Sequence, residues 1–460
     1  MTRQAIIQQI FERGREVFFN QVLQTKQQRL AALNRLEEEL RASEKRLLKA
    51  LKLDLNKSVH EAFMTEIGLI YGELSHAKKH LGRWMKPQRV GISLGQMPGR
   101  VRLHSDPYGC VLIMSPWNYP ALLTINPLIS ALSAGNTVVL KPSAYSPHTS
   151  TVLEQIIRQA FPDDLVQIVT GGREENQALL DIPFDYIFFT GSPKVGRFVM
   201  EKAAQHLTPI TLELGGKSPV IVDQTADIEQ TAKRLLFGKL LNAGQTCIAP
   251  DHVFVHRYVK QKLIDALIKQ SQLIFKDPTY VEDNWPRIIS EKHFKRLKGL
   301  IEQNRVVYGG GSCTERQTIE FTIVDSPPLD SPVMQEEIFG PILPILVYDD
   351  LNQLIREQQQ RPKPLALYLF TKDNRTEQRV LKELSFGGGC INDTVLHISS
   401  TKAPFGGVGN SGMGHYHGKY GFQTFSHQKT ILKKSWFFDV SVRHHPYKSP
   451  DTKLPKWMFK

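Results

Sequence analysis

One cysteine of this chain stands in a polar, turn-forming segment. Cys247 ends the sequence Gly-Gln-Thr-Cys at 244–247, and such a segment can expose a thiol at a cleft, where its thiolate is a nucleophile. The other cysteines, Cys110, Cys313 and Cys390, are scattered and form no CxxC pair. They are expected to be small buried hydrophobes. The spacing therefore predicts neither a metal site nor a disulfide framework.

Two further polar residues could assist a thiol. Glu213 follows an apolar alternation and precedes two glycines. A carboxylate at the end of a strand can be partly buried, which raises its pKa towards that of a general base; a surface glutamate beside a turn is the alternative. Asn118 lies between Pro116 and Pro120. Its amide could donate a hydrogen bond to a developing oxyanion, although a turn asparagine is the commoner role.

A glycine-containing segment, Gly191–Gly196, follows an apolar strand pattern and leads into a helical pattern at 197–204. Glycines there allow the backbone to approach a phosphate, and a helix N-terminus presents free N–H groups to it. The spacing matches neither GxGxxG nor a Walker loop. Two more polar loops, 335–341 and 404–412, are glycine-rich, and each alone would pass as an ordinary loop.

Composition excludes several classes of protein. The 460 residues are 41% hydrophobic and 22% charged, which is typical of a globular chain of two or three domains. The net charge of +13 fits a nucleic-acid protein or an enzyme that binds anionic nucleotides. Because a basic block interleaved with aromatics occurs only weakly at the C-terminus, we expect solvated surface charge and no nucleic-acid partner.

No signal-peptide core or membrane-spanning segment is expected. The N-terminus carries early charges, and prolines and asparagines interrupt the most apolar stretch, 110–140. With no disulfide framework, a reducing compartment is favoured, and we expect a cytoplasmic protein. The tail after Thr430 combines aromatic residues with lysines, so weak contact with a membrane surface stays open.

The elements that must position these residues follow a regular alternation. Residues 1–85 have helical spacing of leucines, and 97–108 resemble a strand pair with a tight turn at Pro98-Gly99, which could form an arm. Apolar strands separated by helices then predict an α/β fold with two doubly wound parallel-sheet domains and a cleft between them. The predicted strands form two series, 111–114, 137–140, 166–169 and 186–189, then 218–222, 253–255, 342–347 and 365–370.

Taken together and in this order, the motifs resemble the aldehyde dehydrogenase superfamily over about residues 60–430. They are PWN (116–118), FTGS (189–192), LELGGK (212–217), GQTC (244–247), EEIFGP (336–341) and PFGG (404–407). The forms KPS (141–143), PWNYP (116–120) and FSH (425–427), with the short chain, resemble the class 3 branch. That branch contains dimeric enzymes that act on fatty and aromatic aldehydes.

The resemblance implies an oxidoreductase that converts aldehydes to carboxylic acids with NAD or NADP through a cysteine thioester. Cys247 would be the nucleophile, Glu213 the general base, and Asn118 with the backbone N–H of Cys247 the oxyanion hole. The implied cofactor-binding residues are Lys141 at the adenosine ribose, Ser143, the pyrophosphate segment Gly191, Ser192, Pro193, Lys194, Val195 and Gly196, Glu337 at the nicotinamide ribose, and Phe339. Tyr71 and Tyr119 could line an apolar substrate entrance, although core packing explains Tyr71 equally well.

The same resemblance implies a division of the chain. Residues 1–95 and 106–214 would bind the dinucleotide, 215–415 would form the catalytic domain, and 96–105 with 416–460 would form an oligomerisation arm and tail. The expected partners are a small-molecule aldehyde, medium- or long-chain aliphatic or aromatic, and a second copy in a homodimer.

One departure concerns the cofactor. Relatives often have glutamate after Lys-Pro-Ser, where it binds the adenosine ribose hydroxyls, but this chain has Ala144. Without that carboxylate the 2′-phosphate of NADP escapes repulsion, so we expect both dinucleotides to be used.

Two other functions remain as alternatives. One is a CoA-acylating aldehyde dehydrogenase or acyl-CoA reductase, against which Glu213 favours water as acyl acceptor. The other is a non-catalytic binding protein, which the joint presence of Cys247, Glu213 and Asn118 disfavours.

Overall fold

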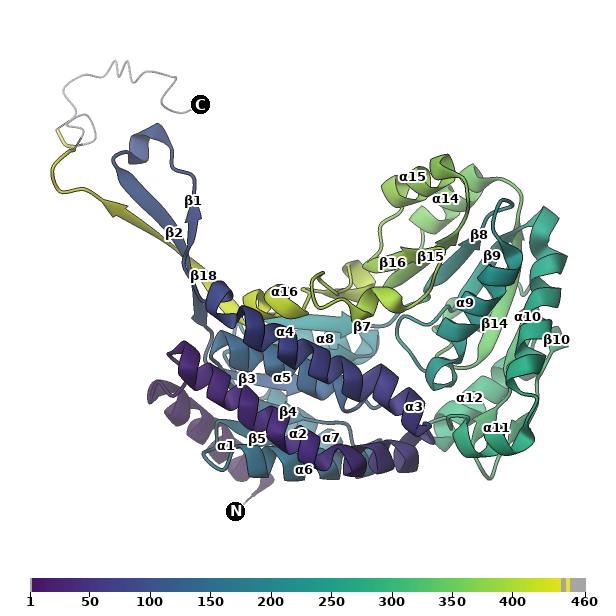
Figure 1. The fold of residues 1–460 in the computed structure, drawn as a ribbon, viewed down its shortest axis with the longest axis horizontal. Helices are drawn as coiled ribbons and strands as arrows, with labels where there is room; N and C mark the ends of the chain where they lie inside the picture. The colour runs from purple at the N-terminus through teal and green to yellow at the C-terminus, as the bar shows by residue number, and fades with distance from the viewer. Residues whose placement is uncertain (1, 440–443, 447–460) are drawn as a thin grey trace.

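The computed structural model describes residues 2–439 and 444–446. It contains two largely parallel sheets with helices around them, and a three-stranded antiparallel sheet that projects from the body as an arm (Figure 1). The predicted α/β class with two parallel-sheet units is confirmed. Part of the predicted tail, at 440–443 and 447–460, lies outside the described residues.

The first sheet has the strand order β17-β7-β6-β3-β4-β5, and only β17 is antiparallel to its neighbour. Its strands β3 and β4 are buried along their whole length, as expected for a sheet with helices on both faces. The strands are β3 (Cys110–Met114), β4 (Thr137–Lys141), β5 (Val166–Ile168), β6 (Tyr186–Gly191), β7 (Ile210–Leu214) and β17 (Gly412–Met413). The helices that connect them are α5 (Leu122–Ala134), α6 (Pro147–Ala160), α7 (Arg173–Leu180) and α8 (Pro193–Ala204).

The second sheet has the order β10-β13-β14-β9-β8-β15-β16, with β10 alone antiparallel. Its strands are β8 (Pro219–Val222), β9 (His252–His256), β10 (Val306–Tyr308), β13 (Thr322–Asp325), β14 (Ile342–Tyr348), β15 (Ala366–Phe370) and β16 (Gly388–Ile391). Its helices are α9 (Ile228–Leu240), α10 (Lys260–Ile274), α11 (Pro278–Asn284), α12 (Glu291–Glu302), α13 (Pro332–Gln335), α14 (Leu351–Gln359) and α15 (Asn374–Glu383). A small ribbon of β11 (Ser312–Cys313) and β12 (Thr318–Ile319) stands apart.

The N-terminal region is helical, as its leucine spacing predicts. Helix α2 begins with a capping box between Thr25 and Gln28, and it buries leucines such as Leu33, Leu36 and Leu40 along one face. The helices of this region are α1 (Arg3–Phe19), α2 (Lys26–Leu55), α3 (Val59–Ala62), a π-helical turn η1 (Phe63–Ile67) and α4 (Gly68–Trp84). Within the described residues, no helix is both long enough and apolar enough to cross a membrane.

The arm differs from its predicted form. Residues 99–107 form one strand, β2 (Gly99–Pro107), and not a strand pair. The partners of β2 are β1 (Gln88–Val90) and β18 (Ser426–Lys434), both antiparallel to it. The prediction was wrong because Pro98-Gly99 begins the strand, and because a partner as distant in sequence as β18 leaves no local hairpin signal. Helix α16 (Gly418–Thr424) leads from the body into β18.

Candidate active site

Cys247 lies after a strained turn that follows helix α9. Asn242, Ala243 and Gly244 all have left-handed backbones, with φ of 52°, 51° and 75°. An alanine in this region is uncommon, and such strain persists only where the surroundings enforce it. A Cβ on Gly244 would lie 2.3 Å from the carbonyl oxygen of Gly340. Only glycine therefore fits where the nucleophile turn packs against the 336–341 loop.

Buried hydrogen bonds hold this turn from several sides. Gln245 is fully buried; its Nε2 donates to the carbonyls of Asn242 (3.0 Å) and Arg287 (2.9 Å). Nδ2 of Asn118 donates to the Gln245 carbonyl at 3.0 Å, and the Tyr119 hydroxyl lies 2.6 Å from Oγ1 of Thr246. The segment containing Asn118 is thus fastened to the two residues that precede Cys247. The amide of Asn118 keeps a second N–H for another acceptor.

A buried ion pair is hydrogen-bonded to the segment that contains Asn118. The Lys57 Nζ lies 2.7 Å from Oε1 of Glu66, and both side chains are fully buried. Lys57 also donates to the Asn118 carbonyl at 3.0 Å, while Oε2 of Glu66 accepts from the backbone N–H groups of Ala121 (2.9 Å) and Leu122 (3.2 Å). Glu66 comes from the π-helical turn η1. The sequence analysis missed this pair, because neither residue belongs to a recognisable motif.

Glu213 is a buried carboxylate without a partner. It lies on β7, its side chain is 4% exposed, and neither carboxylate oxygen has a hydrogen-bond partner among the described residues. Burial raises the pKa of Glu213 well above its usual value. Glu213 is therefore not the surface glutamate that was one of the two alternatives, and its burial agrees with the other alternative, a general base.

Glu337 is a second carboxylate with an unsatisfied atom. Its Oε1 is buried without a partner, and its Oε2 lies where a Cβ on Gly215 would be, 2.3 Å from that position. Burial, and then the charge of Asp251, raise the pKa of Glu337 to about 8. Asp251 fixes the segment by accepting from the N–H of Ile338 at 2.9 Å, and Lys217 binds both Asp251 (2.5 Å) and the Glu336 carbonyl (2.8 Å).

The thiol of Cys247 is half-buried and neutral at rest. Burial raises its pKa to about 12, and the charges of Glu337 and Glu213 contribute in the same direction. The charges of both carboxylates therefore act on the thiol of Cys247. The backbone N–H groups of Cys247 and Ile248 oppose the effect by donating to the sulfur.

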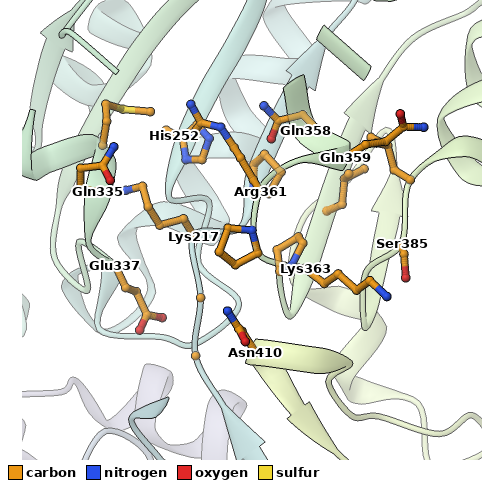
Figure 2. A pocket seen from close by; sticks show the side chains of 18 of the residues that line it. Lys217, His252, Gln335, Glu337, Gln358, Gln359, Arg361, Lys363, Ser385 and Asn410 are labelled. Carbon is orange, nitrogen blue, oxygen red and sulfur yellow. The ribbon is translucent and has the colours of Figure 1, made fainter. Parts of the chain in front are cut away.

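A cavity of about 710 Å³ opens beside Glu337, lined by Pro193, Arg197, Gly215 and Lys217 among others. Figure 2 shows Glu337 and Lys217 on one side of the cavity, with Lys363 and Ser385 on the other. Pro193 begins helix α8, where Ser192 accepts a hydrogen bond from the N–H of Val195 at 3.5 Å.

Of the predicted pyrophosphate segment, Gly191–Gly196, Pro193 lines this cavity. The side chains of Ser192, Lys194 and Val195 are exposed. A Cβ on Gly196 would meet Leu214 at 2.7 Å, so the glycine lets helix α8 pack closely on β7. The N–H groups at the start of α8 are the kind of donors that bind phosphate.

The other predicted cofactor residues lie at strand and loop ends. The Lys141 Nζ donates to the carbonyls of Pro142 and Gly171, both at 2.8 Å, and burial lowers the pKa of Lys141 to about 8. The Ser143 hydroxyl accepts from the N–H of Tyr145 at 3.2 Å. Phe339 has a left-handed backbone (φ 50°), and its ring meets that of Trp117 edge-on at 5.4 Å.

The two tyrosines predicted for a substrate entrance have other contacts. Tyr119 is buried, and its hydroxyl is bound to Thr246, so it positions the nucleophile turn. The hydroxyl of Tyr71 donates to Glu44 at 2.8 Å, and the Arg41 guanidinium lies over its ring at 4.2 Å. Tyr71 therefore fastens α4 to α2, which corresponds to the packing alternative.

The fold and this set of residues define an aldehyde dehydrogenase. The chain belongs to the aldehyde dehydrogenase family, whose model matches residues 2–431. The match begins well before residue 60, because the N-terminal helices belong to the family fold as well.

Individual relatives agree with this assignment. The chain is 45% identical to the 4,4'-diaponeurosporen-aldehyde dehydrogenase of Staphylococcus aureus, over 96% of this chain and 97% of that one. It is 44% identical to aldehyde dehydrogenase family 3 member B1 of Bos taurus, over 92% and 90%. The solved structure of the substrate-bound state of AldH from Staphylococcus aureus superposes with a TM-score of 0.95, at 44% identity and 99% coverage of each chain.

Solved structures of the same fold account for the cofactor. An aldehyde dehydrogenase from Bacillus cereus in complex with NAD+ is 26% identical, with a TM-score of 0.84 over 94% of this chain and 89% of that one. An NADP-dependent enzyme from E. coli has 26% identity and a TM-score of 0.83, over 94% and 91%. The chain is thus an enzyme that oxidises aldehydes with NAD or NADP. The CoA-acylating alternative gains no support from these relatives.

Proposed function

We propose that Cys247 forms the covalent intermediate and that Glu213 activates the water that releases the product. The Cys247 thiol releases its proton, which is the one proton set free in the overall oxidation, as its sulfur adds to the aldehyde carbon. The carbonyl oxygen becomes an oxyanion that the free N–H of Asn118 and the Cys247 backbone N–H stabilise. A nicotinamide dinucleotide, when bound, would supply the hydride acceptor, and loss of hydride would leave a thioester on Cys247. Glu213 then takes a proton from water as its oxygen attacks the thioester, which yields the carboxylic acid and the free thiol.

The observation that carries this assignment is the unpartnered state of Glu213. A fully buried carboxylate with two vacant acceptor atoms is expensive to maintain, so a protein that keeps one has a use for it. Burial raises the pKa of Glu213 well above its usual value, which makes its carboxylate a stronger proton acceptor than an exposed glutamate. A CoA thiol would need no such base.

A rapid-mixing experiment tests this role. The Glu213→Gln variant, mixed with aldehyde and NAD, should give a burst of NADH equal to the enzyme concentration and then a steady rate lowered by about 10²–10⁴-fold. Mass spectrometry of the intact variant should find the acyl group on Cys247, and Cys247→Ser should give neither burst nor adduct. A variant that turns over without a burst, at the unaltered rate, would contradict the assignment.

The residues around the cavity fit a dinucleotide. The vacant Oε1 of Glu337 offers an acceptor for ribose hydroxyls, Phe339 closes that loop, and the first N–H groups of α8 suit the pyrophosphate. We assign Lys141 and Ser143 to the adenosine ribose, as their motif suggests. Ala144 leaves that place without a carboxylate, so we propose that NAD and NADP are both accepted.

The substrate that we propose is an apolar aldehyde of medium or long chain, or an aromatic one. This proposal is supported by the relative named for 4,4'-diaponeurosporen aldehyde and by the class 3 relatives. Steady-state kinetics over a chain-length series, with each dinucleotide, should show kcat/KM rising with chain length and less than about tenfold preference between NAD and NADP. Ala144→Glu should impose a preference for NAD, because the new carboxylate would repel the 2′-phosphate. A large NAD preference in the unaltered enzyme would sink the dual-cofactor proposal.

The structure-wide assignments follow the same reasoning. We propose that the unit built on the first sheet binds the dinucleotide, that the unit built on the second sheet carries the nucleophile, and that the arm mediates a homodimer. We also propose a cytoplasmic location, supported by four free cysteines.

A further inference from the structure

His252 is a buried histidine that the proposed mechanism does not use. It begins strand β9, its side chain is 1% exposed, and it lines the cavity that opens beside Glu337 (Figure 2). Its ring meets that of Phe254 edge-on at 5.0 Å. Burial lowers the pKa of His252 to about 4, so the ring is neutral at neutral pH.

The two ring nitrogens of His252 have different surroundings. Nδ1 lies 3.1 Å from Oδ1 of Asp251. Burial alone would raise the pKa of Asp251, but the charge of Lys217 and then the hydrogen bond from His252 outweigh burial and hold this pKa below its usual value. Because an ionised carboxylate only accepts hydrogen bonds, Nδ1 carries the proton and donates to Asp251. Nε2 is then an acceptor, and it is buried without a hydrogen-bond partner among the described residues.

The unpartnered Nε2 indicates that packing is not the reason for a histidine at this position. A buried polar atom without a partner costs free energy. Phenylalanine would pack against Phe254 without that cost. What histidine adds, in comparison with phenylalanine, is the Nδ1–H that donates to Asp251. The role of His252 therefore lies in this hydrogen bond.

Asp251 connects the segment of the proposed nucleophile to the loop that carries Glu337. It follows the nucleophile by four residues in the sequence. Its Oδ2 accepts from the N–H of Ile338 at 2.9 Å, and its Oδ1 is bound by Lys217 at 2.5 Å. The same Lys217 Nζ donates to the Glu336 carbonyl at 2.8 Å. The residues on both sides of Glu337 are thus fastened to this one carboxylate and its lysine.

We propose that His252 is a positioning residue for the dinucleotide, and that its Nδ1–H holds the Asp251 carboxylate in the orientation that fixes the loop of Glu337. The carboxylate thereby sets the place of Glu337 relative to Cys247, which a dinucleotide needs if its nicotinamide is to face the sulfur. This inference rests on the proposed contact between Glu337 and the nicotinamide ribose.

Two substitutions in the full-length enzyme separate the hydrogen bond from the packing. His252→Phe keeps a ring and removes the N–H donor, whereas His252→Asn removes the ring and keeps an N–H near the position of Nδ1. Titration calorimetry with NAD should show about tenfold weaker binding in His252→Phe, the effect of losing a hydrogen bond to a charged group, and a change of less than about threefold in His252→Asn. Equal losses in the two variants, or a larger loss in His252→Asn, would assign the residue to packing and overturn the proposal.

Hydrolysis of an activated ester provides a readout that does not need the dinucleotide. 4-Nitrophenyl acetate acylates a thiol directly, so its turnover requires Cys247 and Glu213 but not the loop of Glu337, and it should stay within about twofold of the unaltered enzyme in both variants. A fall in ester hydrolysis as large as the fall in NAD binding would give His252 a purely structural role and overturn the proposal.

Two further variants complete the experiment. His256→Phe, at the last residue of β9, is the matched control and should leave NAD binding unchanged; an equal loss there would overturn the proposal. Glu337→Gln distinguishes the two levels of the argument. If it weakens NAD binding and His252→Phe does not, the inference about His252 alone fails. If neither variant weakens NAD binding, the proposed ribose site fails as well.

Discussion

The turn that carries Cys247 differs from the two carboxylates Glu213 and Glu337 in how completely its polar atoms are hydrogen-bonded. Around Cys247, Gln245 and Asn118 use side-chain and backbone groups to fix the chain in a strained shape. Within the part of the chain that the structure describes, Glu213 has no hydrogen-bond partner for either oxygen and Glu337 has none for one of them. A fully hydrogen-bonded network holds its atoms in place, whereas an acceptor without a partner is available to a ligand or to water. We therefore expect Gln245 and Asn118 to position the nucleophile turn, and Glu213 and Glu337 to bind water and dinucleotide.

The largest expected effect comes from breaking the support of the nucleophile side. Lys57→Met should lower the free energy of unfolding by about 3–5 kcal/mol, because it leaves the Glu66 carboxylate buried without its cation. Chemical denaturation followed by tryptophan fluorescence measures it. Lys78→Met, which breaks the more exposed pair between Lys78 and Glu37, is the control and should cost about 1 kcal/mol or less. Equal losses in the two variants would mean that the buried pair has no special role.

Asn118→Ala should lower kcat by about 10²–10³-fold, the usual effect of removing one oxyanion donor. The fall should be visible in stopped-flow measurement of NADH formation with little change in the KM for the dinucleotide. Tyr119→Phe separates chemistry from positioning, because it removes the contact with Thr246 and no oxyanion donor; we expect a much smaller loss. Unchanged turnover in Asn118→Ala, with a deuterium isotope effect showing that hydride transfer limits the rate, would count against the oxyanion role.

The smallest expected effect is a change in the affinity for NAD, and it concerns Glu337. With a pKa of about 8, Glu337 is neutral below that pH and ionised above it. The ionised form is the stronger hydrogen-bond acceptor, so the affinity for NAD should rise as pH rises through 8. Glu337→Gln should bind NAD about tenfold more weakly and without this pH dependence. Titration calorimetry at several pH values measures both, and Glu336→Gln, at the exposed neighbouring position, is the control. A pH dependence that survives in Glu337→Gln would assign it to another group.

The same contrast explains what could be predicted from the sequence. Strands such as β3 and β4 were predictable because burial on both faces makes them apolar throughout. Cys247, Glu213 and Asn118 were singled out because each stands in a short, polar, turn-forming segment. Lys57 and Glu66 were missed because their role depends on burial and on contacts between residues distant in sequence, which a local sequence pattern does not show. The pairing of β18 with β2 was missed for the same reason. The role of Tyr71 stayed open in the sequence because an aromatic residue on a helix has no visible direction there.

The resting state of the thiol has a consequence for the durability of the enzyme. Peroxides and disulfides react with thiolates and hardly at all with protonated thiols. Because burial and two neighbouring acids keep the proton on Cys247, an idle molecule offers oxidants almost nothing to attack. We therefore expect the resting enzyme to lose activity more slowly in peroxide than an enzyme whose active-site cysteine is ionised.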